Sequence, residues 1–158
     1  MRNRPGAPML LRALAAFALA SALSGCAAVG MVAVTANDGR ITGMGQATFP
    51  AAMLVRFADG EERLLTGTLT ERIDGRSGYT LTGPGWGRCT GRDTVEGRNT
   101  VTCADGTRLS FDTGPQGPKM NTVNTAAGRV DGRAFDLAIG WGRSAREEAL
   151  RAALAGAG

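Results

Sequence analysis

The sequence predicts an all-β protein: a small antiparallel β-barrel or sandwich of about eight strands, followed by a short C-terminal helix. Short runs rich in Val, Thr, Leu and aromatic residues alternate with Gly, Asp and Pro through residues 38–143. No helical periodicity appears before residues 144–158. The 24 glycines fit a strongly curved sheet, because glycine marks bends and close approaches of strands.

The clearest predicted hairpin centres on Asp59-Gly60, which separates two apolar runs. A two-residue Asp-Gly loop is typical of a type I′ turn, whose twist matches that of paired strands. Counting back from such a turn places Val55 opposite Leu64, so that the hairpin gains an apolar cross-strand pair. The same register places Arg56 opposite Arg63, an unfavourable pair that either solvent tolerates or a shift of one residue removes.

A repeated motif organises the rest of the domain. We interpret each copy as a turn, a strand, and then a large side chain between two glycines where the strand bends or backbones approach closely. The copies are Asp74-Gly75-Arg76 with Gly85-Trp86-Gly87-Arg88, Asp131-Gly132-Arg133 with Gly140-Trp141-Gly142-Arg143, and an imperfect third, Asp38-Gly39-Arg40 with Gly43-Met44-Gly45.

The end of the chain changes character and predicts a short helix. Ser144-Ala145-Arg146-Glu147 has the pattern of a capping box, and residues 149–154 are strong helix formers. Leu150 and Leu154 are four residues apart and fall on one face of such a helix. We expect this face to lie on the sheet or to plug an end of the barrel.

The first 26 residues resemble a bacterial lipoprotein signal. Arg2, Arg4 and Arg12 form a basic start, residues 13–23 are an apolar run, and Leu23-Ser24-Gly25-Cys26 has the lipobox pattern. The apolar run is well short of the ~20 residues that a spanning helix needs. The resemblance implies cleavage before Cys26 and attachment of a diacylglyceryl thioether, usually followed by an N-acyl chain.

The same resemblance indicates where in the cell the protein is expected. The residue after the lipobox cysteine is Ala27 and not the aspartate of an inner-membrane retention signal, so we expect the periplasmic face of the outer membrane. The membrane would then be a partner through the N-terminal lipid. Met9 would give a tighter basic region and is an alternative start.

The assignment of Cys26 to lipid leaves Cys89 and Cys103 as a pair in an oxidising compartment, where we expect them to be bonded. The bridge would join opposed positions on neighbouring strands, with Thr90 facing Thr102. A turn at Asp105-Gly106 then completes a three-stranded meander over residues 87–112. Residues 113–121, rich in Gly and Pro, are expected to form a mobile surface loop.

The charge of the mature chain gives no reason to expect nucleic acid or anionic lipid as a partner. Three of the 18 Lys and Arg residues precede Cys26 and all 14 acids follow it, so the chain from Cys26 onward carries 15 cations against 14 anions. Nucleic-acid binding rests on clustered, uncompensated positive charge. The length of this part of the chain indicates one ordinary domain.

The sequence predicts no enzyme, no cofactor and no metal site. It contains no histidine, and its single lysine after the signal is Lys119. The usual pairs of nucleophile and base are therefore missing. Glu61 and Glu62 are adjacent on an expected strand and point to opposite faces. The Asp-Gly pairs are explained by turn geometry.

Trp86 and Trp141 are the strongest candidates for recognition among few aromatic residues. Their equivalent setting in the repeat favours a structural interpretation, in which both fill the core or the rim of the barrel.

A second resemblance concerns lipid-anchored bacterial inhibitors of lysozyme, which are small disulfide-bonded β-barrels. A loop serine in a Ser-Gly-x-x-Tyr motif and a lysine from another loop enter the catalytic cleft of the enzyme. Here Ser77-Gly78-Tyr79 lacks the two intervening residues, and Lys119 lies in the expected mobile loop. The resemblance implies a binding role for Ser77 and Lys119.

These observations lead us to expect a lipid-anchored periplasmic binding or structural protein with a protein partner in the envelope. The alternatives are an inhibitor of an envelope-targeting enzyme such as lysozyme, and an adaptor subunit of an envelope assembly. The expected organisation is a signal peptide (residues 1–25), a tether or first strand (26–37), a β domain (38–143), and a helix and tail (144–158).

Overall fold

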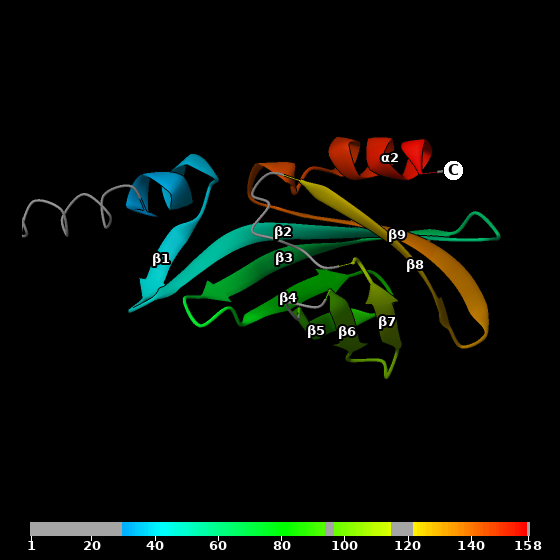
Figure 1. The fold of residues 1–158 in the computed structure, drawn as a ribbon. Coiled ribbons are helices and arrows are strands. Elements are labelled where there is room, and N and C mark those ends of the chain that lie inside the picture. The colour runs from blue at the N-terminus through cyan, green and yellow to red at the C-terminus, as the bar shows by residue number, and fades with distance from the viewer. Residues whose placement is uncertain (1–29, 94–96, 115–121, 158) are drawn as a thin grey trace, which may run out of the picture. The chain divides into compact units, whose positions relative to one another are not determined.

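The computed structural model describes residues 30–93, 97–114 and 122–157. The chain divides into two units, Met1–Ala33 and Val34–Gly158, and the second unit contains the whole sheet. Its elements in order are β1 (Arg40–Gly43), β2 (Gln46–Phe57), β3 (Glu62–Arg72), β4 (Ser77–Gly83), β5 (Gly87–Asp93), β6 (Arg98–Cys103), β7 (Arg108–Asp112), β8 (Val123–Val130), β9 (Arg133–Trp141), a 3₁₀ turn η1 (Gly142–Ser144) and α2 (Glu147–Gly156) (Figure 1).

The strands form an eight-stranded antiparallel barrel with one additional strand. Each strand pairs with its neighbours in the sequence, and β2 also pairs with β9, which closes the barrel. Residues 51–57 of β2 face residues 141–135 of β9. β1 pairs with residues 46–48 of β2 and so lies past the end of β9 along the same edge of β2 (Figure 1). The predicted fold class is confirmed, and the architecture is a barrel.

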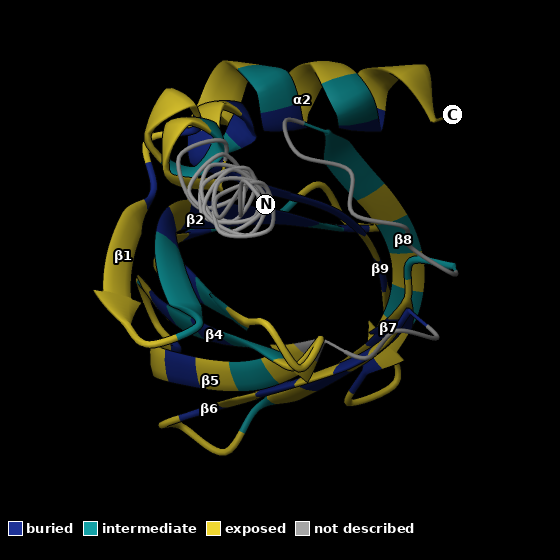
Figure 2. Cartoon of the chain, turned by 60° about the vertical axis from the view of Figure 1, so that its left-hand side comes forward, coloured by how far each residue is buried: buried dark blue, intermediate teal, exposed yellow. Residues whose placement is uncertain are grey.

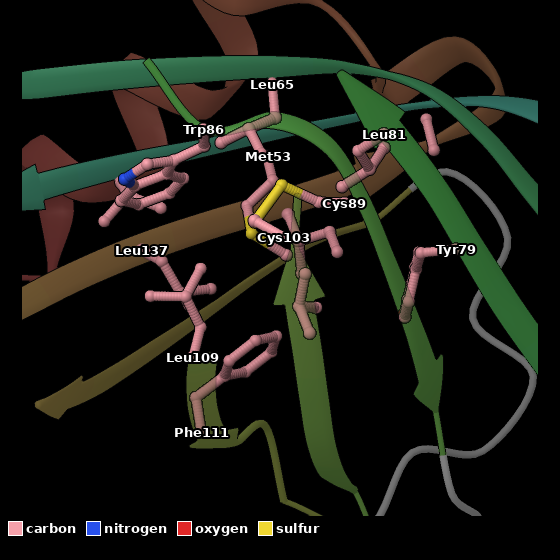
Figure 3. Packing of buried hydrophobic residues seen from close by; sticks show 14 of the residues in the cluster. Met53, Leu65, Tyr79, Leu81, Trp86, Cys89, Cys103, Leu109, Phe111 and Leu137 are labelled. Carbon is pink, nitrogen blue, oxygen red and sulfur yellow. A yellow bond between two sulfur atoms is a disulfide. The ribbon is translucent and has the colours of Figure 1, made fainter. Parts of the chain in front are cut away.

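Side-chain alternation along the strands fills the barrel interior. On β2, Phe49, Met53 and Phe57 belong to the interior cluster, whereas Ala52 and Leu54 belong to a separate cluster on the outer face. Figure 3 shows the interior packing around the disulfide, with leucines and aromatic rings contributed by strands on all sides. A barrel of this size has an interior that is just wide enough for side chains to fill.

The C-terminal helix lies on the outer face of the sheet. Leu150 and Leu154 of α2 are buried in the outer cluster, against Ala52, Leu54 and Ala138. The helix is therefore confirmed, and of the two expected placements the structure shows the one on the sheet.

The predicted capping box is wrong. Arg146 occupies the N-cap position of α2 without a side-chain hydrogen bond. Ser144 lies earlier, in η1, and its hydroxyl lies within hydrogen-bond distance of two carbonyl oxygens, those of Trp141 (2.8 Å) and Thr122 (3.1 Å). The serine thus ties the end of β9 to the start of β8 and is not available to the helix.

The predicted register of the first hairpin is also wrong, by one residue. Leu64 faces Leu54, and Arg56 faces Glu62, with which it forms an ion pair of 2.8 Å. The turn is one residue longer than a two-residue loop, because Gly60 donates to the carbonyl of Phe57 and adopts a left-handed conformation at φ 88°. This arrangement is a turn followed by a one-residue bulge, and it replaces the unfavourable Arg–Arg pair with an attractive one.

The same turn recurs at two other Asp-Gly pairs. Gly75 donates to Arg72, and Gly106 donates to Cys103, and both glycines have positive φ. In each turn the aspartate carboxylate accepts from the backbone N–H two residues later. A two-residue turn with positive φ at both central positions occurs instead at Asp131-Gly132, where Val130 pairs directly with Arg133.

The cysteine pair and the meander are as predicted. Cys89 and Cys103 face each other on β5 and β6 and are bonded, and Thr90 faces Thr102. β5, β6 and β7 form the expected meander.

The segment expected to be a tether or first strand shows no strand in its described part. Residues 30–36 are helical, and the first strand begins at Arg40. β9 ends at Trp141, and η1 and α2 follow it, close to the predicted boundary between the β domain and the helix.

Glycine allows neighbouring strands to approach closely where the sheet curves. A Cβ atom at Gly67, in the middle of β3, would overlap the carbonyl oxygen of Thr80 on β4. No residue with a Cβ atom therefore fits at position 67 unless β3 and β4 move apart.

Candidate functional site

Two of the predicted site residues, Cys26 and Lys119, lie outside the described residues. The expected loop over residues 113–121 lies mostly outside them as well. Ser77 is the first residue of β4, is half-buried, and faces Glu71 on one side and Asp93 on the other. A serine paired on both sides within a sheet does not project from the surface as an inhibitory loop does.

Both tryptophans are buried in the barrel. Trp86 is 4% exposed and Trp141 is 8% exposed, and both belong to the interior cluster. Trp86 lies in the turn between β4 and β5 and makes an edge contact with the ring of Phe57 at 6.2 Å. The guanidinium of Arg63, from β3, lies 4.9 Å from the centre of a Trp86 ring. The tryptophans therefore occupy positions that suit the structural interpretation.

A network of charges lies at the barrel end that holds Trp86. Arg133 binds both Asp59 (2.6 Å) and Glu61 (2.7 Å), and Glu61 also binds Arg63 (2.7 Å). Arg133 lies over the ring of Phe57 at 3.9 Å. The network thus connects the β2–β3 turn to the β8–β9 turn and covers the aromatic residues beneath it.

A second network ties α2 to the barrel. Glu62 accepts from Arg56 (2.8 Å) and from Arg151 of the helix, and Arg151 also binds Glu147 (2.7 Å). Glu61 and Glu62 therefore belong to separate networks on opposite faces, as the strand pattern predicts.

These contacts shift the pKa values of the acids downward. Hydrogen bonds from Arg133 and then Arg63 lower the pKa of Glu61, and those from Arg151 and Arg56 lower the pKa of Glu62. The backbone N–H of Glu61, followed by Arg133, lowers the pKa of Asp59. A general acid or base needs the opposite shift, toward neutrality. Near neutral pH these carboxylates are held as anions in ion pairs.

The described residues contain no group of three or more Cys, Asp or Glu side chains that could hold a metal ion. The chemistry of this part of the barrel is that of a stable, charge-paired scaffold.

The most unusual exposed surface lies at the opposite end of the barrel. Met44, in the β1–β2 turn, is 105% exposed, Ile73, in the β3–β4 turn, is 90% exposed, and Ile41 of β1 is 55% exposed. We call these three residues the turn-tip patch. Figure 1 shows the two turns side by side at the same end of the barrel.

Backbone contacts hold the two tips together. The N–H of Ile73 donates to the carbonyl of Gly45 (2.8 Å). A Cβ atom at Gly45 would lie 2.7 Å from the Ile73 side chain, so this side chain lies directly over the glycine. The patch is thus a defined structure and not two independent loops.

Arginines flank the patch. Arg72 and Arg76, on either side of the β3–β4 turn, share the carboxylate of Asp74 at 3.5 and 4.0 Å. Arg40 on β1 is exposed. Apolar tips bordered by long cationic side chains can enter an apolar environment while the charges remain in water.

Sequence reasoning missed the patch, although the repeat contains a signal for it. In all three copies the second glycine of the Gly-x-Gly motif has positive φ: 68° at Gly45, 65° at Gly87 and 62° at Gly142. The imperfect third copy has Met44 at the position where the other two have a buried tryptophan. The replacement of the tryptophan by Met44 is the sequence signal that could have identified this copy as the one whose large side chain is exposed.

No known protein family, curated protein or solved structure compared with this chain matches it. Within the described residues, no helix has the length and apolar character needed to cross a membrane.

Proposed function

We propose that this protein is a lipid-anchored component of the bacterial envelope, held through Cys26 at the periplasmic face of the outer membrane. The observation that carries the proposal is the bond between Cys89 and Cys103. It uses two of the three cysteines, so the third, at the lipobox position, has no other cysteine to pair with. A disulfide is also typical of an oxidising compartment.

The role is binding or structure and not catalysis. Glu61, Glu62 and Asp59 are neutralised by arginines, and their lowered pKa values oppose proton transfer near neutral pH. The near-balanced charge of the mature chain gives no support to a nucleic-acid partner.

Between the two alternative roles, the structure favours an anchored adaptor over an enzyme inhibitor. An inhibitor of the lysozyme-binding kind needs a projecting serine, whereas Ser77 lies within paired strands. An anchored adaptor does not need a serine in that position.

Metabolic labelling with an alkyne fatty acid tests the anchor. The wild-type protein should incorporate the label, and the Cys26→Ser variant should not, whereas a Cys89→Ser/Cys103→Ser variant should be labelled like the wild type. Labelling of Cys26→Ser would refute the anchor.

A lysozyme assay with the purified mature protein separates the two roles. The adaptor role predicts no effect on turnover at stoichiometric excess, and inhibition that is lost in Ser77→Ala would favour the inhibitor role instead.

A further inference from the structure

The exposed apolar side chains of this chain are not scattered. Among the described residues, the large exposed ones are Ile41, Met44 and Ile73 in the turn-tip patch, and Met31 and Val32 just before the barrel. The described residues at the opposite end and around the barrel wall include none. Clustered apolar exposure indicates a contact surface, whereas single exposed residues do not.

The patch projects beyond the point where β9 ends. β9 pairs with β2 only as far as Ala51, and β2 begins at Gln46. At about 3.3 Å per residue, these five residues carry the β1–β2 turn roughly 17 Å past the last β9 pair. Figure 2 shows β1 at the edge of the barrel, exposed along its whole length.

A short tether joins the proposed anchor to the barrel. Val34, where the barrel unit begins, follows Cys26 by eight positions. Because residues 30–33 are helical, this stretch spans at most about 20 Å. A bilayer that holds the lipid of Cys26 therefore lies within about 20 Å of Val34.

The shape of the patch suits a bilayer better than a protein. It consists of two narrow tips, each ending in one large apolar side chain, and a stable protein interface needs about 800 Å² on each partner. A lipid surface accepts isolated apolar side chains without a complementary shape. Arg40, Arg72 and Arg76 border the tips and are exposed, and Asp74 forms ion pairs with Arg72 and Arg76. Long cationic side chains at such a border can keep their charges in water or beside lipid phosphates.

We infer that the turn-tip patch rests on the same bilayer that holds the lipid of Cys26, with Met44 and Ile73 inserted among the lipid headgroups. The inference rests on the proposed anchor. It orients the barrel, so that the end with Trp86 and the Asp59–Glu61–Arg133 network faces away from the membrane.

Tryptophan quenching by brominated lipid tests this orientation. The native tryptophans are buried, so an added surface tryptophan dominates any lipid-dependent change. Met44→Trp and Ile73→Trp place the probe in the patch, and Ala58→Trp, in the exposed β2–β3 turn at the opposite end, is the matched control. Each full-length protein is isolated from envelopes and reconstituted into phosphatidylethanolamine–phosphatidylglycerol vesicles with or without bromine on the acyl chains.

In brominated vesicles, the emission added by the tryptophan at position 44 or 73 should fall about twofold relative to non-brominated vesicles. Residues inserted at the interface lie roughly 5–10 Å deep, within reach of the brominated acyl chains. Ala58→Trp should match the wild type. Equal quenching by brominated lipid in all three variants, with the protein acylated, would overturn the inference and leave the anchor intact. The mass of the same samples reports acylation, and its absence would refute the anchor and the inference together.

Discussion

Ile73 and Gly45 join two turns that lie 28 residues apart in the sequence, through a hydrogen bond of 2.8 Å from the isoleucine N–H to the glycine carbonyl. The left-handed conformation of Gly45, at φ 68°, fits the turn from β1 into β2, and its lack of a Cβ atom leaves room for the Ile73 side chain. One glycine thus sets both the turn and the position of the adjacent apolar tip.

Curvature of the barrel should depend on Gly67. Gly67→Ala places a methyl group against the carbonyl of Thr80 and should destabilise the fold by about 1–3 kcal/mol, the usual range for overpacking. Gly78→Ala is the matched control, because its Cβ atom would lie at an ordinary 3.4 Å from the nearest atom. Denaturant titrations of both variants measure the difference, and equal midpoints would contradict the close approach of β3 and β4.

Both tryptophans should be required for stability. Trp86→Ala and Trp141→Ala each remove a buried ring and should cost about 3–5 kcal/mol in the free energy of unfolding. Trp86→Ala also removes the partner of the Arg63 guanidinium. A melting temperature equal to that of the wild type in either variant would mean that the ring is not part of the core and would return it to the candidates for recognition.

The disulfide should contribute strongly to stability. It closes a loop of about 15 residues, for which the loop-entropy relation gives ~3 kcal/mol. The Cys89→Ser/Cys103→Ser variant should therefore unfold at a clearly lower denaturant concentration. Alkylation and mass spectrometry of native material should find no free thiol at either position. Two alkylated cysteines there would exclude the bond.

Acid should weaken the charge network. The pKa values of Glu61 and Glu62 lie below their usual 4.5 in the folded protein, and that of Asp59 lies below 3.8. The contribution of these carboxylates to the stability of the fold is therefore complete above these usual values. It is lost as the pH falls through the lowered folded-state values. The melting temperature should decline on acidification below about pH 4.5.

Removal of Arg133 should reduce that decline. Arg133→Gln deletes the first cause of the Glu61 shift, so the loss of melting temperature between neutral and acid pH should be smaller than in the wild type. Arg143→Gln, at an exposed arginine, should keep the wild-type profile. Parallel profiles for all three proteins would show that Arg133 does not set the acid response.

The sequence predicted those features that depend on local pattern. The strand alternation, the Cys89–Cys103 pairing and the helix face of Leu150 and Leu154 follow from periodicities and distances along the chain, and all three are present. The hairpin register was missed because an Asp-Gly pair fits both a two-residue turn and a turn with a bulge. The choice between them depends on cross-strand contacts such as Arg56–Glu62.

The exposed patch could not be predicted from composition, because Met44 and Ile73 are ordinary apolar residues whose exposure depends on tertiary structure. β1 pairs with residues 46–48 of β2, beyond the last β9 pair at Ala51, and β9 ends at Trp141, where η1 begins. The capping-box prediction failed at the same place, since the tertiary contacts of Ser144 with Trp141 and Thr122 outweigh a local cap.

Fractionation of the envelope tests the central claim most directly. Wild-type protein and Cys26→Ala are expressed from the native start, and inner membrane, outer membrane and soluble periplasm are separated on a density gradient. The account predicts wild-type protein in the outer membrane with acyl mass on Cys26, and the variant without acyl mass and absent from the outer membrane. Wild-type protein without acyl mass, or Cys26→Ala recovered in the outer membrane at the wild-type level, would contradict it.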